Sequence, residues 1–371
     1  MDPARIWVDG CFDFTHHGHS GAMLQAKKLG THLVVGIHSD PAILANKGPT
    51  VMTLPERILA VSACRWSDEP VPNAPYVTDP AWLDAFGCKY VVHGDDLTTD
   101  SEGGDCYRIV KEAGRFKIVK RTPGISTTDL VGRMLVLSRN HHMHHRLQEV
   151  EEAELVRLRA YASDSAGVEG NGPPLLEIPR NAEGVKEHGL WDTVVAGVMP
   201  KEGQPIIYVD GGFDLFTPGH ISVLSLITAA YKDQKPYLVL GLHSDTTINS
   251  HKGLNYPIMN LLERTLLVLQ CRYVSAVIVN APYTPTGEFL DQVSAKFGGK
   301  IEAVWHGPTK LGSGDEDTYK DAKERGIYRE IEKHEWQHVS AGEIVNRILR
   351  ERERYEERQR RKGVKMETFG G

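Results

Sequence analysis

His16 and His19 are the pair of residues in this chain best spaced for phosphoryl-transfer chemistry. They belong to the run His16-His17-Gly18-His19, which follows the strand-like run RIWVDG and precedes an apolar helical pattern. Two imidazoles at a helix entrance can both face a phosphate at the helix N-terminus, where the helix dipole favours negative charge. Their N–H groups can stabilise charge that develops on phosphoryl oxygens. An isolated H-x-G-H motif is a surface turn about as often as it is a phosphate site. The neighbouring motifs therefore decide whether this one is expected to bind phosphate.

The run RTPGISTTD at residues 121–129 could form a second anion site. Ser126 and Asp129 have capping-box spacing, which predicts a helix that begins at Ser126 and offers its first backbone N–H groups to an anion. Arg121 adds a planar guanidinium suited to phosphate, and Thr127 adds a hydroxyl donor. An ordinary helix cap explains Ser126 and Asp129 but requires neither Arg121 nor Thr127.

Two weaker motifs also follow strand-like runs. Lys47, with Gly48, lies in a loop after GIHSD, where an ammonium could neutralise a polyphosphate. The run His93-Gly94-Asp95-Asp96 ends another strand, and its carboxylates could accept hydrogen bonds from nucleotide hydroxyls or amines. Taken alone, each motif is at least as well explained by a solvated loop.

Most of these motifs occur twice in the chain. His19 corresponds to His220 after 201 residues, and Arg133 corresponds to Arg347 after 214 residues. The spacing grows along the chain while the order of the motifs stays the same. This pattern indicates a duplication followed by small loop insertions.

Short β-branched runs alternate with longer helical patterns in each copy, which predicts an α/β fold with parallel sheets flanked by helices. The predicted domains are residues 1–150 and 204–371. Residues 151–203 contain ASDSAGVEGNGPP, a poor former of helices and strands, and are predicted to be a linker. The histidine tract at 141–145 fits no closed zinc site and is predicted to be a solvated helix end. The charged C-terminal run carries a possible docking face, formed by Ile344, Ile348, Leu349 and Tyr355.

Composition narrows the function classes. The 371 residues carry a formal net charge of -6, which gives no reason to expect nucleic-acid binding. The five cysteines form no C-x-x-C pair, so a reducing compartment is expected. The chain begins without a secretory signal pattern and has no apolar run of membrane-spanning length. A cytoplasmic protein with at most peripheral membrane association is predicted.

These motifs, in this order, resemble those of the cytidylyltransferase family, whose hallmarks are H-x-G-H and R-T-x-G-I-S-T. The resemblance covers nearly the whole chain apart from residues 151–203. It implies two tandem Rossmann-like nucleotidyltransferase domains. The runs KRTPGISTTDLVGRML and CRWSDEPVPNAPYVT, together with the tandem arrangement, are most similar to members that act on phosphoethanolamine. The implied reaction of CTP with phosphoethanolamine gives CDP-ethanolamine and pyrophosphate in phosphatidylethanolamine biosynthesis, with Mg²⁺ accompanying CTP.

The resemblance also assigns roles to individual residues. The implied catalytic residues are His16, His19, Lys47 and Arg121. The implied nucleotide-binding residues are Gly10, Phe12, Gly18, Gly94, Asp95, Asp96, Thr122, Ile125, Ser126 and Thr127. Asp13 and Tyr76 are weaker candidates for the amine end of the substrate, and no resident metal ligand is predicted.

The second copy lacks several of these groups. It has Thr217 for His16, Glu335 for Arg121, Pro308-Thr309 for Asp95-Asp96, and Ala341-Gly342 for Thr127-Thr128. Ser340 and Glu343 keep the capping-box spacing, so the helix start is expected to persist without the phosphate-binding groups. The second domain is therefore predicted to be catalytically silent and to support or regulate the first.

Other functions stay open at this point. The choline-phosphate enzymes of the family are similar over one domain, and another small phosphorylated alcohol could be the acceptor. Adenylyl-transferring relatives share H-x-G-H but carry a K-M-S-K-S loop, which this chain lacks in the corresponding place. A non-catalytic nucleotide-binding scaffold and an oligomer also remain possible.

Overall fold

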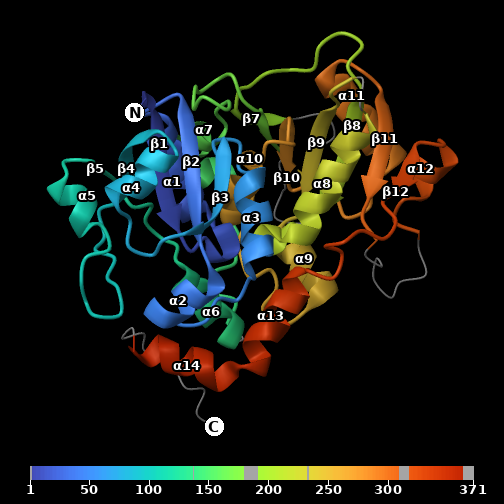
Figure 1. Cartoon of the computed structure of the whole chain (residues 1–371). Coiled ribbons are helices and arrows are strands. Elements are labelled where there is room, and N and C mark those ends of the chain that lie inside the picture. Colours follow the sequence, from blue (N-terminus) through green and yellow to red (C-terminus); the bar gives the residue numbers. More distant parts are fainter. Residues whose placement is uncertain (1, 137, 179–190, 232–233, 309–316, 362–371) are drawn as a thin grey trace. The chain divides into compact units, whose positions relative to one another are not determined.

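Two compact units make up the protein (Figure 1). The computed structural model describes residues 2–136, 138–178, 191–231, 234–308 and 317–361. Unit 1 comprises Met1–Ser138 and Ala341–Gly371, and unit 2 comprises Arg139–Ser340. These boundaries differ from the predicted ones, because the last helices of the second copy belong to unit 1 and the predicted linker belongs to unit 2.

The sheet of unit 1 confirms the predicted parallel α/β architecture. Its strands are β1 (Asp2–Gly10), β2 (His32–His38), β3 (Glu69–Ala74), β4 (Cys88–Gly94) and β5 (Phe116–Val119). They are all parallel, in the order β3-β2-β1-β4-β5. The strand order reverses at β1, which lies between β2 and β4. In open parallel sheets, ligands bind beyond the carboxyl ends of the strands at such a reversal.

Helices cover this sheet and fix the ends of its strands. They are α1 (His17–Lys27), α2 (Asp40–Asn46), α3 (Leu54–Ala63), α4 (Pro80–Ala85), α5 (Arg108–Glu112), α6 (Thr127–Leu135), α13 (Ala341–Arg350) and α14 (Arg352–Arg361). Trp7 of β1 is fully buried and packs against Trp82 and Phe86 of the α4 segment. Gly36 of β2 lets the Trp7 ring approach, since a Cβ there would lie 2.2 Å from the indole. Large buried aromatic side chains of this kind dominate the stability of such a core.

Unit 2 repeats the same five-stranded order. Its corresponding strands are β8 (Ile206–Gly211), β9 (Tyr237–Leu242), β10 (Ala276–Val279), β11 (Ile301–His306) and β12 (Tyr328–Glu330). Its helices are α7 (Glu152–Tyr161), α8 (Pro218–Ala230), α9 (Asp245–Lys252), α10 (Leu261–Leu269), α11 (Gly287–Phe297) and α12 (Lys320–Glu324). With two further strands, β6 (Leu175–Glu177) and β7 (Asp192–Val195), the full sheet runs β12-β11-β8-β9-β10-β6-β7. The two tandem Rossmann-like folds are therefore present.

The segment predicted as a linker contributes two strands to unit 2. β6 (Leu175–Glu177) pairs in parallel with β10, and β7 (Asp192–Val195) pairs with β6 in the antiparallel sense. Leu175 and Leu176 are only 0% and 2% exposed. Burial of these leucines against the sheet outweighs the poor local propensity of the glycine and proline residues that precede them.

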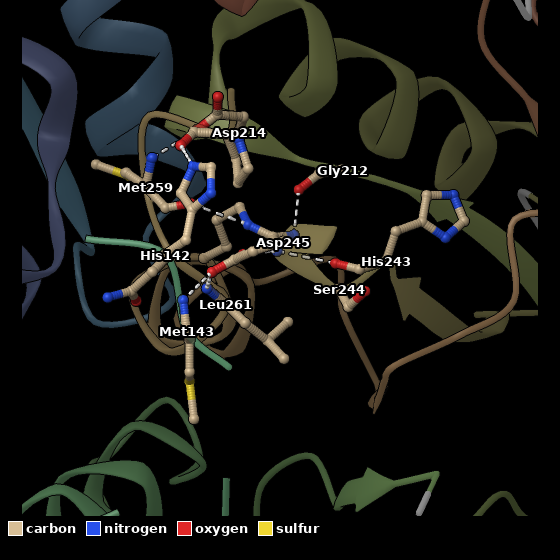
Figure 2. Close-up of polar contacts among 12 residues, drawn as sticks. His142, Met143, Gly212, Asp214, His243, Ser244, Asp245, Met259 and Leu261 are labelled. Atoms are coloured by element: carbon tan, nitrogen blue, oxygen red, sulfur yellow. Dashed lines mark hydrogen bonds and ion pairs between the residues drawn. The ribbon is translucent and has the colours of Figure 1, made fainter. Parts of the chain in front are cut away.

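The histidine tract is not a solvated helix end, which corrects the prediction. Nε2 of His141 lies 2.7 Å from the Pro257 carbonyl oxygen. The Met143 amide donates to the Asp245 carboxylate at 2.7 Å, as Figure 2 shows. The tract is bound by a backbone carbonyl and by a side-chain carboxylate within unit 2, and only His144 and His145 of the tract are exposed.

The predicted C-terminal docking face is confirmed for Ile344, Ile348 and Tyr355, which are all buried, whereas Leu349 is 43% exposed. α13 and α14 pack against α6 within unit 1 (Figure 1). Among the described residues, no helix combines the length and apolar character needed to cross a bilayer.

Candidate active site

A turn of unusual backbone geometry joins β1 to α1 and delivers His16. Phe12, Phe14 and Thr15 have φ values of 53°, 64° and 40°, in the left-handed region that bulky residues rarely occupy. Both phenylalanines are buried, and their packing holds this turn. His16 then lies at the N-cap of α1, but its side chain makes no capping hydrogen bond. The imidazole is thus directed by the turn and not by a helix cap.

Asp13 holds a neighbouring loop in place. Its two carboxylate oxygens accept hydrogen bonds from the amides of Val51 and Met52, each at 2.9 Å. Burial raises the pKa of Asp13, and these amides oppose the shift. Asp214 of the second copy accepts the same pair of bonds from its own loop. Because both copies share the arrangement, Asp13 has a structural role in holding this loop.

The two motif histidines lie face to face. The His16 and His19 rings stack with centres 3.8 Å apart and an interplanar angle of 19°. The Phe12 ring lies 5.4 Å from His19. Nδ1 of each histidine is buried and has no hydrogen-bond partner among the described residues. Since an unpaired buried nitrogen costs free energy, a phosphate oxygen is a suitable partner for either ring.

The H-x-G-H and R-T-x-G-I-S-T motifs meet at Gly18. A Cβ on Gly18 would lie 2.9 Å from Nδ1 of His16 and 3.0 Å from Cγ2 of Ile125. Ile125 is buried, and the next residue, Ser126, is the N-cap of α6. Its hydroxyl accepts from the Asp129 amide at 3.1 Å, as predicted. Glycine is therefore required where the two helix entrances come into contact.

Arg121 lies beside the end of β4. Its amide donates to the Asp95 carboxylate at 3.1 Å, and its guanidinium lies 3.7 Å from the Asp96 carboxylate. The Arg121 and Asp96 side chains are 54% and 47% exposed, so this ion pair is weak. Gly94 allows the loop to fold back, because a Cβ there would lie 2.7 Å from Oδ1 of Asp96. The guanidinium can consequently leave Asp96 for a phosphate.

Electrostatics place both predicted cations near the histidines. Burial, together with the smaller effects of the charges of Arg121 and Lys47, lowers the pKa of His16 to about 3. Burial, followed by His16 and Lys47, also holds the pKa of His19 well below its usual value. The imidazoles are therefore neutral at physiological pH. The structure brings His16, His19, Lys47 and Arg121 to one site.

The depressed pKa of His16 gives a testable dependence of stability on pH. The unfolded chain binds a proton at this residue below about pH 6.5, and the folded protein does so only near pH 3. His16 therefore costs stability as the pH falls from about 6.5 towards 3. Between pH 7.5 and 5.5, wild-type protein should lose about 1 kcal/mol more unfolding free energy than His16→Asn. Denaturant titrations measure both, and equal losses would contradict the assignment.

The remaining predicted residues line the same strand ends. Gly10 ends β1, and a Cβ on it would lie 3.3 Å from the Phe12 ring. Thr127 is the first residue of α6, and Thr122 lies in the loop before it, with both half-buried. The Tyr76 ring lies 5.0 Å from the ring of His38, and burial raises the pKa of its phenol.

Two residues near the site are absent from the sequence prediction. Asp9 at the end of β1 accepts from Nε1 of Trp7 at 2.8 Å and from the Tyr107 hydroxyl at 2.6 Å. Asp9 belongs to the strand-end motif that recurs in the second copy, so the sequence could have identified it as a site residue. Arg358 of α14 carries a charge that lowers the pKa of Asp13 and of Tyr76 against the effect of burial. No local sequence pattern connects Arg358 with β1.

The second copy uses its surviving histidine as a helix cap. Thr217, at the position of His16, is the N-cap of α8, and its amide donates to Nδ1 of His220 at 3.1 Å. The Thr217 hydroxyl lies 3.2 Å from the same nitrogen. The corresponding nitrogen of His19 has no such partner among the described residues. Glu335 is exposed, and Thr309 lies outside the described residues.

Comparisons with known proteins agree with this geometry. The sequence matches the cytidylyltransferase-like family over residues 7–133 and 208–347. It is 40% identical to ethanolamine-phosphate cytidylyltransferase of Mus musculus, covering 98% of this chain and 90% of that protein. It is also 40% identical to the Dictyostelium discoideum enzyme of that name, covering 99% and 96%. Choline-phosphate cytidylyltransferase 2 of Arabidopsis thaliana is 44% identical but covers only 36% of this chain. The chain belongs to the ethanolamine-phosphate cytidylyltransferases of the cytidylyltransferase-like family.

Proposed function

We propose that this protein transfers the cytidylyl group of CTP to phosphoethanolamine, releasing pyrophosphate and forming CDP-ethanolamine for phosphatidylethanolamine biosynthesis. The observation that carries the proposal is the meeting of His16, Lys47 and Arg121 in unit 1, where the charges of both cations act on the buried imidazole. The similarity to ethanolamine-phosphate enzymes over almost the entire chain supports the choice of acceptor.

The reaction is an in-line displacement at the α-phosphorus of CTP. A phosphate oxygen of phosphoethanolamine forms the new bond to that phosphorus while the bond to the oxygen bridging the α- and β-phosphates breaks. No covalent enzyme intermediate is needed, so the residues act by positioning and by charge stabilisation. As neutral imidazoles, His16 and His19 each donate one N–H to the α-phosphoryl oxygens, where charge builds up in the transition state.

The departing pyrophosphate requires cations and donors on the other side of the site. Arg121 exchanges its weak contact with Asp96 for a phosphate oxygen, and Lys47 contributes a mobile ammonium. The Thr127 hydroxyl and the positively polarised start of α6 complete this set. We assign the nucleoside end of CTP to Gly94 and Asp95.

Mg²⁺ belongs to this proposal as an ion that arrives with CTP. Among the described residues, no group of three or more His, Cys, Asp or Glu side chains could hold a metal ion. Mg²⁺ is commonly bound through substrate phosphates and water with few protein ligands. When bound, it would neutralise phosphate charge, and we assign no residue of this chain to hold it.

The ethanolamine ammonium requires a cation-binding surface. Tyr76 offers an aromatic face beside the ring of His38. A cation over a tyrosine ring gains about 0.5 to 2 kcal/mol, depending on desolvation. In unit 2 the corresponding Tyr283 is covered by His251, with ring centres 3.6 Å apart. This contrast favours the first copy as the amine site.

Pyrophosphate release with CTP and either phosphoethanolamine or phosphocholine tests the assignment of substrate. We expect kcat/KM to be highest with phosphoethanolamine, and a strong preference for phosphocholine would reject it. The structure describes all five cysteines, and none of them forms a disulfide. A reducing compartment fits this, and we propose the cytoplasm as the site of action.

The duplicated lysines provide a matched pair of variants. Lys47→Met should lower kcat/KM for CTP about tenfold to a hundredfold, since a charge-assisted bond to phosphate is lost. Lys252→Met removes the lysine at the same position of the second copy, where it is exposed near the Tyr256 ring. Steady-state kinetics should show little change in that variant. Equal losses from both would contradict a site confined to the first copy.

A further inference from the structure

Side chains of the C-terminal helices bind three consecutive carbonyl groups of the loop that follows Lys47. Arg358 donates to the Pro49 carbonyl at 2.9 Å, and the Tyr355 hydroxyl donates to the Thr50 carbonyl at 3.3 Å. Arg347 donates to the Val51 carbonyl at 3.3 Å. Asp13 binds the amides at the far end of the same loop. The loop is therefore held from both sides, and one side comes from the end of the chain.

The same helices also contact the other half of the phosphate site. Nε2 of Gln359 donates to the Thr128 carbonyl in the first turn of α6 at 2.7 Å. Arg347 is fixed by Glu56, with both of its contacts to this carboxylate at 2.8 Å. One element thus joins the Lys47 loop to the helix that follows Arg121. We call residues 341–361, which form α13 and α14, the C-terminal strap.

The side chains that α14 buries are suited to positioning more than to simple packing. In the described part of the helix, Tyr355 and Gln359 are the buried side chains, at 3% and 2% exposure. Both use their polar atoms on the backbone of unit 1. A helix retained only for its hydrophobic contacts would present a stripe of apolar residues instead. The contacts made by α14 define where the loop lies.

We propose that the C-terminal strap positions Lys47 for the CTP phosphates, with Arg358 as the positioning residue that fixes the loop next to Gly48. This inference rests on the proposed function and gives the second copy a concrete contribution to catalysis in the first. Gly48 has a φ of 102°, and a Cβ there would lie 4.0 Å from Cδ of Arg358. The Arg358 side chain therefore passes directly beside the residue that links Lys47 to the loop.

A double-mutant cycle separates positioning from an independent role. Arg358→Met should lower kcat/KM for CTP about tenfold, the cost of one hydrogen bond from a charged donor. Because Arg358 acts through Lys47, adding this change to Lys47→Met should cause little further loss. If the two losses multiply in the double variant, the residues act independently and the proposal is wrong.

Two further variants control for general damage to the helix. Arg354→Met removes a charge from the same helix, where Arg354 is paired with the nearby Glu351, and should leave kcat/KM within about twofold of wild type. Arg358→Lys keeps a cationic donor and should restore most of the loss. An Arg358→Met variant as active as Arg354→Met would overturn the proposal. If Arg358→Met fails to fold, Tyr355→Phe takes its place in the double-mutant cycle with Lys47→Met, because it removes only the hydroxyl group.

Calorimetric binding of CTP to the same proteins distinguishes this inference from the proposed function. Wild-type protein that binds CTP but does not turn it over with phosphoethanolamine would reject the proposed acceptor alone. The strap would still be supported if Arg358→Met and Lys47→Met weaken CTP binding non-additively. Additive weakening would reject the strap and leave the acceptor assignment intact.

Discussion

Replacing His16 with alanine should lower kcat about a hundredfold to a thousandfold, the usual cost of losing one donor to a developing oxyanion. The KM values for CTP and phosphoethanolamine should change much less, because the lost bond strengthens in the transition state. His16 is 6% exposed, and its ring stacks on His19. Steady-state kinetics on a variant with a wild-type thermal transition measure the effect.

His16→Asn provides the matched variant for this prediction. An asparagine amide keeps an N–H donor in a similar volume, so it should recover part of the activity that alanine loses. Unchanged turnover in His16→Ala would remove the imidazole from the mechanism. A loss carried entirely by KM would assign His16 to ground-state binding instead.

Arg121→Glu should lower kcat/KM for CTP by about a thousandfold or more, since it both removes a phosphate-binding guanidinium and introduces a charge that repels the triphosphate. The variant copies the second repeat, which has Glu335 at this position. Arg121→Gln removes the cation without adding a negative charge. Its kcat/KM for CTP should lie between those of wild type and Arg121→Glu. Pyrophosphate release at varied CTP concentration gives the comparison.

The side chain at position 121 is half exposed, so neither variant should alter the fold. A further test follows from the weak contact with Asp96. That contact competes with CTP for the Arg121 guanidinium. Asp96→Asn removes the competing charge and leaves the guanidinium in place, so it should not weaken CTP binding through Arg121. If Arg121→Gln and Arg121→Glu were equally active, repulsion of the triphosphate would play no part, and Arg121 would not face the phosphates.

Much of the fold follows from local sequence patterns. The β-branched runs and the helical periodicity correctly predicted two sheets of mainly parallel strands, and the Ser126 cap correctly predicted the start of α6. These signals are local, because a strand end and a helix cap are encoded within a few residues. The meeting of the two motifs at Gly18 is consistent with the strand order, since the first motif follows β1 and the second follows β5, which is separated from β1 only by β4.

Other features depend on contacts between distant segments and could not be predicted in the same way. β6 has three residues, so its leucines become recognisable as a strand only when β10 lies beside them. Asp13 resembles a ligand-binding carboxylate in sequence, yet its oxygens accept from amides 38 and 39 residues away. Arg358 reaches a loop 309 residues earlier in the chain. Such contacts are set by tertiary packing, which short-range propensity does not describe.

The duplication explains how one copy could lose its chemistry while the protein keeps both. His220 has become part of a helix cap, and the strands of the second copy retain the order of the first. Its last two helices belong to unit 1, where they hold the Lys47 loop. On this account the second copy persists because the first depends on it structurally.

A crystal structure of the protein with CTP tests the central claim most directly. We predict a single triphosphate in unit 1, with the imidazole nitrogens of His16 and His19 within hydrogen-bond distance of the α-phosphate and with Arg121 and Lys47 at the β- and γ-phosphates. A triphosphate seated in unit 2, or one in unit 1 that leaves His16 and Arg121 without contact to any phosphate oxygen, would contradict the account.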